Sequence, residues 1–388
     1  MQLEAIQAAL REHKLDAWLF YDHHYRDPIA YHILGLPEDA LVTRRWYYLV
    51  PAEGEPRKLV HRIEAGRLDA LPGSKGVYSS WQELDVGLAA LVAPYQRIAM
   101  QYSPRNAIMY VSLVDAGTVE VLRELGKQVV SSADLVSRFE AVLTDKQIAS
   151  HYEAQSALDE VLAEGFREMG RRVRSGRVTE FDMVQWLQEA MRRADLIWEH
   201  GTNVSVNENS ADSHYEPDFK RAKEIRQGDF VLIDIWARKN HPGTCYYDIT
   251  WTGVVGREPS EHEQHVFSIV KADRDAAIQT VSEAFANNRP ISGWQADDAA
   301  REVIRNAGYG EYFTHRTGHN IGNILHGNGA HLDNLETHDE RLLLPNTCFS
   351  VEPGIYLDEF GVRSEINMIA TPGKAAVTGR MQQELVRI

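Results

Sequence analysis

Two glutamates in apolar strands are the first sign of chemistry in this sequence. Residues 349–369 are typical of two strands joined by a turn-rich loop, and each strand carries one glutamate, Glu352 or Glu365. Glutamate is depleted in strands and is almost never fully buried without a partner. Two glutamates on one hairpin would repel each other unless a cation lies between them or they share a proton. We interpret this stretch as half of a metal site.

A second predicted hairpin carries two aspartates in the same way. Asp234 interrupts the apolar strand 230–236, and Asp248 interrupts the strand 246–252. The aspartates are 14 residues apart, and the glutamates are 13 apart. Two such hairpins that face each other would gather four carboxylates in one place. The repeated pattern also hints at an internal duplication.

Each hairpin supplies a candidate supporting partner for its acids. Residues two apart in a strand share a face. This spacing places Thr250 beside Asp248 and Arg363 beside Glu365. Polar groups in such positions orient metal-binding carboxylates. We therefore expect Thr250 and Arg363 to hold these acids in place.

A glycine-rich segment adds imidazoles. Residues 317–327 place glycines around His319 and His326, and glycine lets the backbone approach a site closely. A carboxylate-rich set with one imidazole favours Mn²⁺ or Co²⁺ over a thiolate-type zinc site. Four carboxylates and one histidine are too many for one hydrolytic zinc. They fit a centre of two ions about 3.5–4 Å apart, with a bridging water or hydroxide as nucleophile.

Each of these residues alone has an ordinary explanation. A single aspartate in a strand is more often a turn or edge residue, and any one of the 16 histidines is more often structural or exposed. A Glu-Pro-Gly turn needs no metal. What favours a metal centre is the joint pattern of four acids on two hairpins, with a histidine between them in the sequence.

This pattern resembles a known family. The pita-bread metallopeptidases, which include methionine aminopeptidase, aminopeptidase P and prolidase, have a similar five-ligand set, matched here by Asp234, Asp248, His319, Glu352 and Glu365. The local motifs 247–250, 318–322, 351–356 and 361–365 match as well. The resemblance covers about residues 145–388 directly. The preceding region resembles the N-terminal domain of the prolidase, aminopeptidase P and creatinase branch, which methionine aminopeptidases lack.

The resemblance implies a role for each ligand. Asp248 and Glu365 would bridge two divalent metal ions per chain. Asp234 would complete one ion, while His319 and Glu352 would complete the other. The implied metal is Mn²⁺, with Co²⁺ or Zn²⁺ as alternatives. A metal-bridging hydroxide would attack the scissile carbonyl, and Glu352 would take and pass the water proton.

Two further histidines gain roles from the same resemblance. His326 matches the family histidine that contacts the substrate. Residues 209–215 resemble the segment whose histidine binds substrate or stabilises the tetrahedral oxyanion, which assigns that role to His214. Without the resemblance, His214 would be interpreted as a solvated loop histidine.

The sequence departs from the family pattern around the first hairpin. The loop between Asp234 and Asp248 is a few residues longer than usual, and the gap from His214 to Asp234 is also longer. Trp251 stands where many members have arginine, and Ile-Trp-Ala follows Asp234 where a small residue and glycine are common. No ligand is lost. We expect these changes to lie near the pocket and to affect substrate choice more than metal binding.

Two domains would position these residues. Residues 1–140 alternate short strand and helix signals, which predicts a small α/β domain of the creatinase-like N-terminal type. Residues 141–388 predict four helices interleaved with strand hairpins, as in the pita-bread metallopeptidase catalytic domain. The predicted helices begin near Thr144, Thr179, Ser260 and Trp294. The expected fold class is an α/β N-terminal domain followed by an α+β pita-bread (creatinase/aminopeptidase) catalytic domain.

Composition narrows the partners. The net charge of −15, with no strong basic block, argues against nucleic acid and anionic membranes. No apolar run approaches the ~20 residues that span a bilayer, and the N-terminus does not resemble a signal peptide. Cys245 and Cys348 are expected to be buried thiols in a reducing compartment. We expect a cytoplasmic protein, and the resemblance implies a homodimer.

The leading expectation is a dinuclear-metal hydrolase that cleaves Xaa-Pro bonds in small peptides, as prolidase or aminopeptidase P does. The sequence leaves open which of the two it resembles in substrate, and whether the polar loop 21–27 reaches an active site. One alternative is a metal-dependent hydrolase of a small non-peptide substrate on the same fold. Another is a non-catalytic pita-bread domain that serves as a binding scaffold, although such domains usually lose metal ligands.

Overall fold

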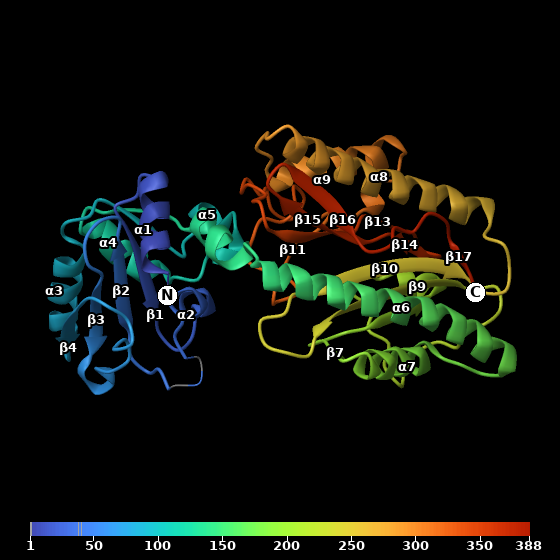
Figure 1. Cartoon of the computed structure of the whole chain (residues 1–388), viewed down its shortest axis with the longest axis horizontal. Coiled ribbons are helices and arrows are strands. Elements are labelled where there is room, and N and C mark those ends of the chain that lie inside the picture. The colour runs from blue at the N-terminus through green and yellow to red at the C-terminus, as the bar shows by residue number, and fades with distance from the viewer. Residues whose placement is uncertain (1, 38, 40) are drawn as a thin grey trace. The chain divides into compact units, whose positions relative to one another are not determined.

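The structure is a computed structural model that describes residues 2–37, 39 and 41–388 (Figure 1). By its internal contacts the chain divides into two compact units, Met1–Glu140 and Ala141–Ile388. Each unit has hydrophobic cores of its own, and each is described by itself.

The N-terminal unit is built on one six-stranded sheet. In chain order its strands are β1 (Ala17–Asp22), β2 (Trp46–Pro51), β3 (Arg57–His61), β4 (Ser74–Tyr78), β5 (Arg97–Met100) and β6 (Gln128–Ser131). Their order in the sheet is β4-β3-β2-β1-β5-β6. Only β2 runs antiparallel to its neighbours; β1, β3, β4, β5 and β6 share one direction. Their carboxyl ends therefore meet at one edge of the sheet.

Helices cover both faces of this sheet because successive side chains of β1 are apolar on both faces. Trp18 and Phe20 lie in a core with α1 (Leu3–Glu12), α2 (Pro28–Leu34) and α5 (Ala133–Val136). Leu19 lies in the opposite core with α3 (Trp81–Val92) and α4 (Ala116–Glu124). This layering is that of an α/β unit.

The C-terminal unit contains four long helices, α6 (Asp145–Ser175), α7 (Glu180–Arg193), α8 (Glu261–Ala286) and α9 (Gly293–Asn306). Each begins with a capping box, in which a hydroxyl residue and the residue three positions later satisfy each other's backbone N–H groups. The capping residues are Thr144, Thr179, Ser260 and Ser292. The four predicted helices are confirmed, with α9 beginning one residue earlier than predicted.

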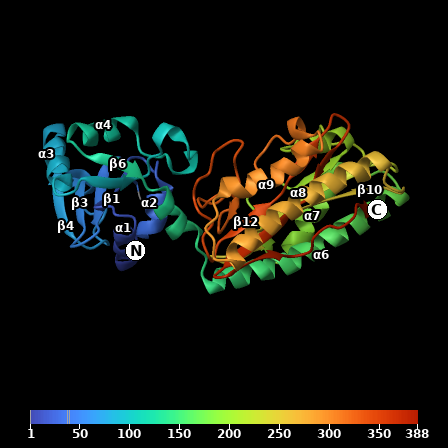
Figure 2. The same ribbon diagram turned by 90° about the horizontal axis from the view of Figure 1, so that it is seen from above.

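Three sheets lie between these helices. The first contains β7 (Leu196–Ile197), β8 (Asn203–Val206), β9 (Phe230–Lys239), β10 (Tyr247–Val254) and β17 (Val386–Arg387). The second contains β11 (Asn320–Ile321), β12 (Cys348–Val351), β15 (Ile366–Thr371) and β16 (Lys374–Thr378), and the third pairs β13 (Gly354–Tyr356) with β14 (Gly361–Arg363). Helices α6 and α7 pack on the first sheet, whereas α8 and α9 pack on the second, so the sheets form the middle layer (Figures 1 and 2).

The two predicted hairpins are present, but the second is interrupted. Strands β9 and β10 pair without a break. In the second hairpin β12 pairs with β15, and β13 pairs with β14, so both arms break between these strands. Pro353, at one break, has no N–H to donate to a ladder. Glu352 and Glu365 therefore lie at the breaks and not within strands as expected.

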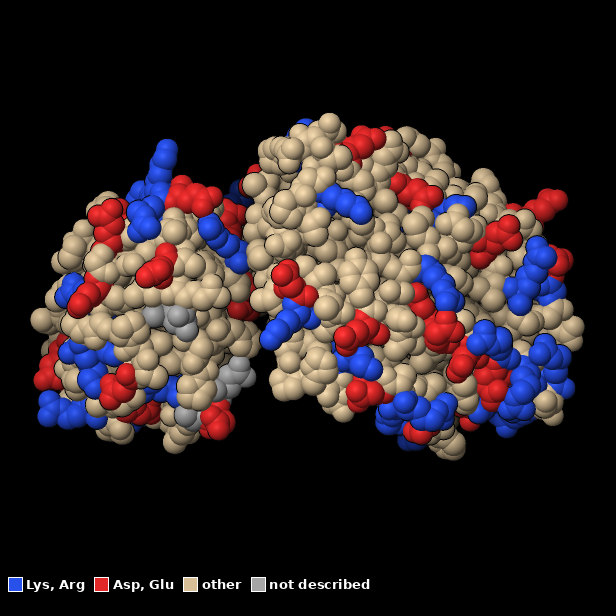
Figure 3. Space-filling model, in the orientation of Figure 1, with Lys and Arg blue, Asp and Glu red and all other residues tan. Residues whose placement is uncertain are grey.

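Cys245 and Cys348 are buried free thiols, as predicted. None of the helices in the described residues combines the length and the apolar character needed to cross a membrane. On the face drawn in Figure 3, acidic and basic side chains are interspersed on both units.

Candidate metal centre

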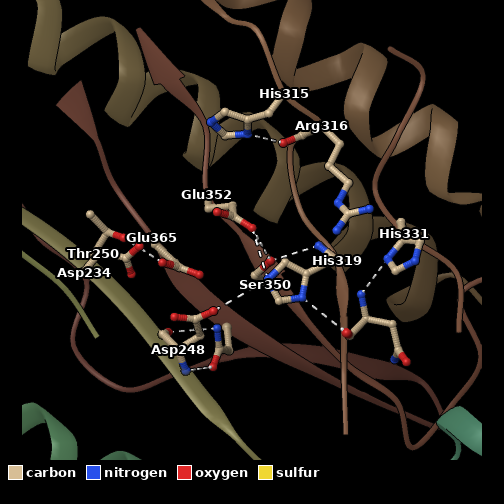
Figure 4. A network of polar contacts seen from close by, with 12 residues as sticks. Asp234, Asp248, Thr250, His315, Arg316, His319, His331, Ser350, Glu352 and Glu365 are labelled. Atoms are coloured by element: carbon tan, nitrogen blue, oxygen red, sulfur yellow. Dashed lines mark hydrogen bonds and ion pairs between the residues drawn. The ribbon is translucent and has the colours of Figure 1, made fainter. Parts of the chain in front are cut away.

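The five predicted ligands come together in the C-terminal unit (Figure 4). Ligand atoms of Asp248, His319 and Glu365 lie within 4.8 Å of one another. His319 Nε2 lies 3.6 Å from Asp248 Oδ2 and 3.3 Å from Glu352 Oε1. Asp234 lies on the same face of the β9–β10 hairpin as Asp248, and Figure 4 shows its carboxylate close to that of Glu365.

Asn367 on β15 ties the two hairpins together at this point. The backbone N–H of Asp248 donates to Asn367 Oδ1 at 2.9 Å, and Asn367 Nδ2 donates to the Asp248 carbonyl at 3.0 Å. Both backbone groups of one ligand are thereby fixed by a residue of the other hairpin. The two pairs of acids face each other because the sheets are joined here.

Gly318 lets the histidine segment lie against β12. A Cβ at this position would lie 2.0 Å from the carbonyl oxygen of Ser350, so no other residue fits without a backbone shift. The N–H of His319 donates to Ser350 Oγ at 2.9 Å, and Ser350 Oγ donates to Glu352 Oε1 at 2.9 Å. One serine therefore orients both a histidine and a glutamate of the centre.

Three carboxylate oxygens of this cluster are buried and accept no hydrogen bond from the described part of the chain: Asp234 Oδ1, Asp248 Oδ1 and Glu365 Oε1. A buried carboxylate oxygen without a donor or a cation is energetically costly. Three such oxygens beside one imidazole provide the donor set that hard divalent cations prefer. The residues present therefore fit a divalent metal centre.

The pKa values of the same acids agree with this interpretation. Burial raises the pKa of Asp248 and of Glu365 well above the usual carboxyl range, and the neighbouring carboxylates raise both further. Burial also raises the pKa of Asp234. Arg363 opposes this rise at Asp234, and bound divalent ions would favour the ionised forms of all three acids.

Glu352 differs from the other acids. Burial opposes its ionisation, but the nearby His319, His315 and Arg363 hold its pKa below the usual glutamate value. Its carboxylate is therefore the one in the cluster that ionises most readily. A group of this kind can accept a proton from a nearby water and then release it.

The supporting partners differ from the predicted pairing. Thr250 Oγ1 donates to Glu365 Oε2 at 2.8 Å and not to Asp248. Arg363 forms an ion pair with Asp234, and its Nε donates to Thr250 Oγ1 at 3.1 Å. Both side chains reach across to the other hairpin. Alternation along a single strand describes only the faces of that strand, so it could not predict these contacts.

Two residues that the sequence analysis did not name extend this network. Arg363 Nη1 donates to the Tyr356 hydroxyl at 3.0 Å, and that hydroxyl lies 2.6 Å from His315 Nε2. Burial lowers the pKa of His315 to about 4, so its imidazole is neutral at pH 7. Tyr356 stands seven residues before Arg363, at the opposite end of the β13–β14 ladder. This spacing is the only sequence feature that could have suggested a contact between the two side chains.

The two remaining predicted histidines lie on loops. The ring of His326 contacts that of His319 edge-on, with centroids 4.3 Å apart. The charge of His319 lowers the pKa of His326 to about 3, with contributions from burial, Arg316 and His214. His214 itself is exposed, and its ring makes no hydrogen bond within the described residues. Figure 4 shows the side chain of Arg316 beside His319.

A buried glutamate holds the loop that carries His214. Glu180, fully buried at the start of α7, accepts hydrogen bonds from the backbone N–H groups of Val206 and Lys223 at 2.8 and 2.7 Å. It also accepts from Asn209 Nδ2 at 2.9 Å and from the Tyr215 hydroxyl at 2.7 Å. Its donors therefore come from both ends and from the middle of segment 206–223.

One departure from the family pattern lies away from the centre. Trp251 alternates with Asp248 and Thr250 along β10, so its side chain is on the opposite face. There it packs against the core formed with α6 and α7. The expectation that this tryptophan lies near the pocket is therefore wrong.

Comparison with known proteins places this chain among metallopeptidases. Residues 151–372 match the model of metallopeptidase family M24. The chain is 29% identical over 349 residues to a probable dipeptidase, PepE, of Mycobacterium tuberculosis, covering 87% of this chain and 84% of that protein. It is 32% identical over 165 residues to the Xaa-Pro dipeptidase of Pyrococcus furiosus, which covers 42% of this chain and 43% of the relative.

Solved structures show the same fold along the whole chain. The dipeptidase PepE of Mycobacterium ulcerans superposes with a TM-score of 0.71 at 23% identity, covering 100% of this chain and 96% of that one. The prolidase of Pyrococcus horikoshii superposes with a TM-score of 0.65 at 21% identity, covering 99% of each. The predicted fold class, an α/β N-terminal region followed by a pita-bread domain, is confirmed. The family model spans more than half of the 388 residues, and the chain belongs to metallopeptidase family M24.

Proposed function

We propose that this chain is a two-metal hydrolase that cleaves Xaa-Pro bonds of small peptides. The observation that carries the proposal is the group of three buried carboxylate oxygens without donors, gathered beside His319 and Glu352. The names of the relatives, a dipeptidase and an Xaa-Pro dipeptidase, support a peptide substrate.

The ligand roles follow the arrangement of the acids. Two divalent ions held here would polarise the scissile carbonyl and activate a water molecule as nucleophile. Asp248 and Glu365 would be shared between the ions, which their proximity supports. Asp234 would serve one ion, and His319 with Glu352 the other. Among Mn²⁺, Co²⁺ and Zn²⁺, the hard carboxylate-rich set favours Mn²⁺.

Glu352 is the proposed proton carrier. Its pKa is held low, so it is ionised and able to take a proton from the attacking water. It would pass that proton to the leaving nitrogen. His214 and His326 would contact the substrate and stabilise charge on its carbonyl oxygen. The neutral His315, through Tyr356 and Arg363, would keep Asp234 in place.

Compartment and assembly form a separate part of the proposal. The free, buried thiols of Cys245 and Cys348 support a reducing compartment, the cytoplasm. A homodimer is carried over from the family resemblance. Light scattering coupled to size-exclusion chromatography tests it: a mass of one chain, 44.0 kDa, would contradict the dimer.

The decisive experiment is a substrate panel on chelated protein with Mn²⁺ added back. Gly-Pro-type dipeptides, longer Xaa-Pro peptides and matched Xaa-Ala peptides would be compared. Cleavage of Xaa-Pro but not Xaa-Ala bonds, lost on chelation and restored by Mn²⁺, is the expected result. The preferred peptide length separates a dipeptidase from an aminopeptidase. If no Xaa-Pro peptide is cleaved, the proposed specificity is wrong.

A further inference from the structure

A second candidate site lies in the N-terminal unit, at the edge where the carboxyl ends of its parallel strands meet. The chain leaves β1 towards β2, β3 and β4 on one side, and then returns through α3 to β5 on the other side of β1. In open α/β sheets, ligands bind outside the carboxyl ends of the strands at such a point of reversal. The topology therefore marks this edge before any side chain is considered.

A cavity of about 750 Å³ occupies this edge. Its walls are the carboxyl ends of β1, β3 and β4, the start of β2 and the first turns of α3 and α4. Small-molecule sites in proteins have volumes of about 300–1,000 Å³. The cavity belongs entirely to this unit and does not involve the metal centre.

Aromatic rings form part of the wall. Tyr21 and Tyr47 lie with ring centroids 5.0 Å apart, and Tyr78 lies edge-on to His61 at 4.9 Å. Trp81, at the first position of α3, is 67% exposed, although a side chain of this size is normally buried for the most part. The three tyrosines are buried, so the exposed indole is the flat surface of this wall on which a planar ring can stack.

Three arginines supply positive charge: Arg26, Arg44 and Arg45. None of them forms an ion pair within the described part of the chain, unlike Arg301, Arg341 and Arg363 of the other unit. Burial lowers the pKa of His23, and the charges of His24, Arg26 and Arg45 lower it further. Two of the three guanidinium groups are therefore close enough to act on one side chain of the wall.

The acidic residues of the wall do not neutralise this charge. Asp115 caps α4, where it accepts from the Thr118 N–H and hydroxyl, both at 2.9 Å. Asp85 is exposed and lies one turn into α3. The three arginines are exposed, and Arg44 also acts on the carboxylate of Glu64, so the cavity presents a hydrated, positively charged surface that an anion can approach.

We propose that this cavity binds a small organic anion, a planar ring that carries a phosphate or a carboxylate. The guanidinium groups of Arg44 and Arg45 hold the anionic group, and the ring stacks against Trp81. The site is independent of the proposed peptidase function. It also gives a purpose to the polar loop after β1, which supplies His23 and Arg26.

The test is isothermal titration calorimetry on the full chain with three probes. Adenosine 5′-monophosphate represents ring phosphates, benzoate represents ring carboxylates, and inorganic phosphate represents the anion alone. We expect one of the two ring probes to bind, and which one binds identifies the anionic group. The double substitution Arg44→Ala/Arg45→Ala should weaken binding at least tenfold, and Trp81→Ala should weaken the ring probe but not inorganic phosphate.

The matched control is Arg11→Ala, because Arg11 is exposed on α1, on the other face of the sheet. It should leave binding unchanged, and all variants should keep wild-type peptidase activity. Failure of both ring probes to bind would overturn the proposal. So would inorganic phosphate binding as tightly as the ring probes, which would mean an adventitious ion only. Dissociation of an oligomer by the double substitution, without loss of ligand affinity, would show a subunit interface instead.

Discussion

The two acid-bearing hairpins of the C-terminal unit present their carboxylates in different ways. Asp234 and Asp248 project from the uninterrupted strands β9 and β10, so strand alternation sets their direction. Glu352 and Glu365 lie at breaks, where the chain passes from one short ladder to another. The short aspartate side chains on the uninterrupted strands and the longer glutamate side chains at the breaks reach the same cluster. The hairpins therefore look alike in sequence but have different backbones.

The strongest test of this comparison removes one proposed metal-bridging acid from each hairpin. Asp248→Ala and Glu365→Ala should each abolish metal binding and lower kcat/KM by roughly 10³-fold or more, because each removes an acid close to both proposed ions. Elemental analysis of protein purified without chelator, with up to two ions per wild-type chain, and peptidase assays with added Mn²⁺ are the measurements. Full activity in either variant would contradict a metal mechanism.

The next test breaks the ion pair that joins the hairpins. Arg363→Met leaves the carboxylate of Asp234 buried without its cation, and removing one partner of a buried pair costs about 3–5 kcal/mol. Urea unfolding of chelated protein at pH 8 should show this loss. Arg380→Met is the control, because Arg380 and its partner Glu160 are both 57% exposed. Equal stability of the two variants would mean that the pair contributes nothing.

The difference between the hairpins also shows what the sequence can predict. The acids that gather in the candidate metal centre could be predicted, because an acid among apolar residues is unusual wherever it falls. The four helices could be predicted from their apolar periodicity, and capping-box spacing at Thr144 and Ser260 also marked the starts of two of them. The hydrogen-bond and ion-pair partners of Thr250 and Arg363 could not be predicted, because they depend on how two sheets face each other. The breaks around Glu352 and Glu365 were missed because the surrounding residues remain apolar through them.

Titration of chelated protein gives a smaller effect with a defined sign. The folded-state pKa values of Asp248 and Glu365 are raised above their unfolded values of about 4, so the metal-free fold binds more protons than the unfolded chain. These two acids should therefore make the free energy of unfolding of the metal-free protein fall as the pH rises above about 4. Glu352, with a lowered pKa, contributes the opposite trend only below about pH 4.5.

Buried histidines with lowered pKa values, such as His315 and His326, make stability rise with pH up to about pH 6.5. Above that pH we expect the Tm of chelated protein to fall from pH 7 to pH 8, and Mn²⁺ to raise the Tm more at pH 8. In Asp248→Asn, which cannot titrate at this position, the fall should be shallower. A Tm of the chelated wild type that rises over the same range would show that these acids are ionised without metal.

Glu180 is a second buried glutamate of this unit, and it can be compared with Glu365. It is as buried as Glu365, with 0% and 1% of the residue exposed, yet both of its oxygens accept hydrogen bonds. Glu365 has one oxygen that accepts none within the described residues. We infer that Glu180 positions the loop of His214 and holds no metal.

Glu180→Gln replaces one acceptor oxygen with an NH₂ group that faces donors. This should lower kcat/KM roughly tenfold through loss of hydrogen bonds worth about 1–3 kcal/mol, while metal content stays unchanged. If Glu180 acts through His214, the double variant Glu180→Gln/His214→Ala should be no less active than His214→Ala alone. Glu189→Gln, exposed on the same helix, is the control. Multiplicative losses in the double variant would show that Glu180 stabilises the unit generally, and metal loss would place it among the ligands.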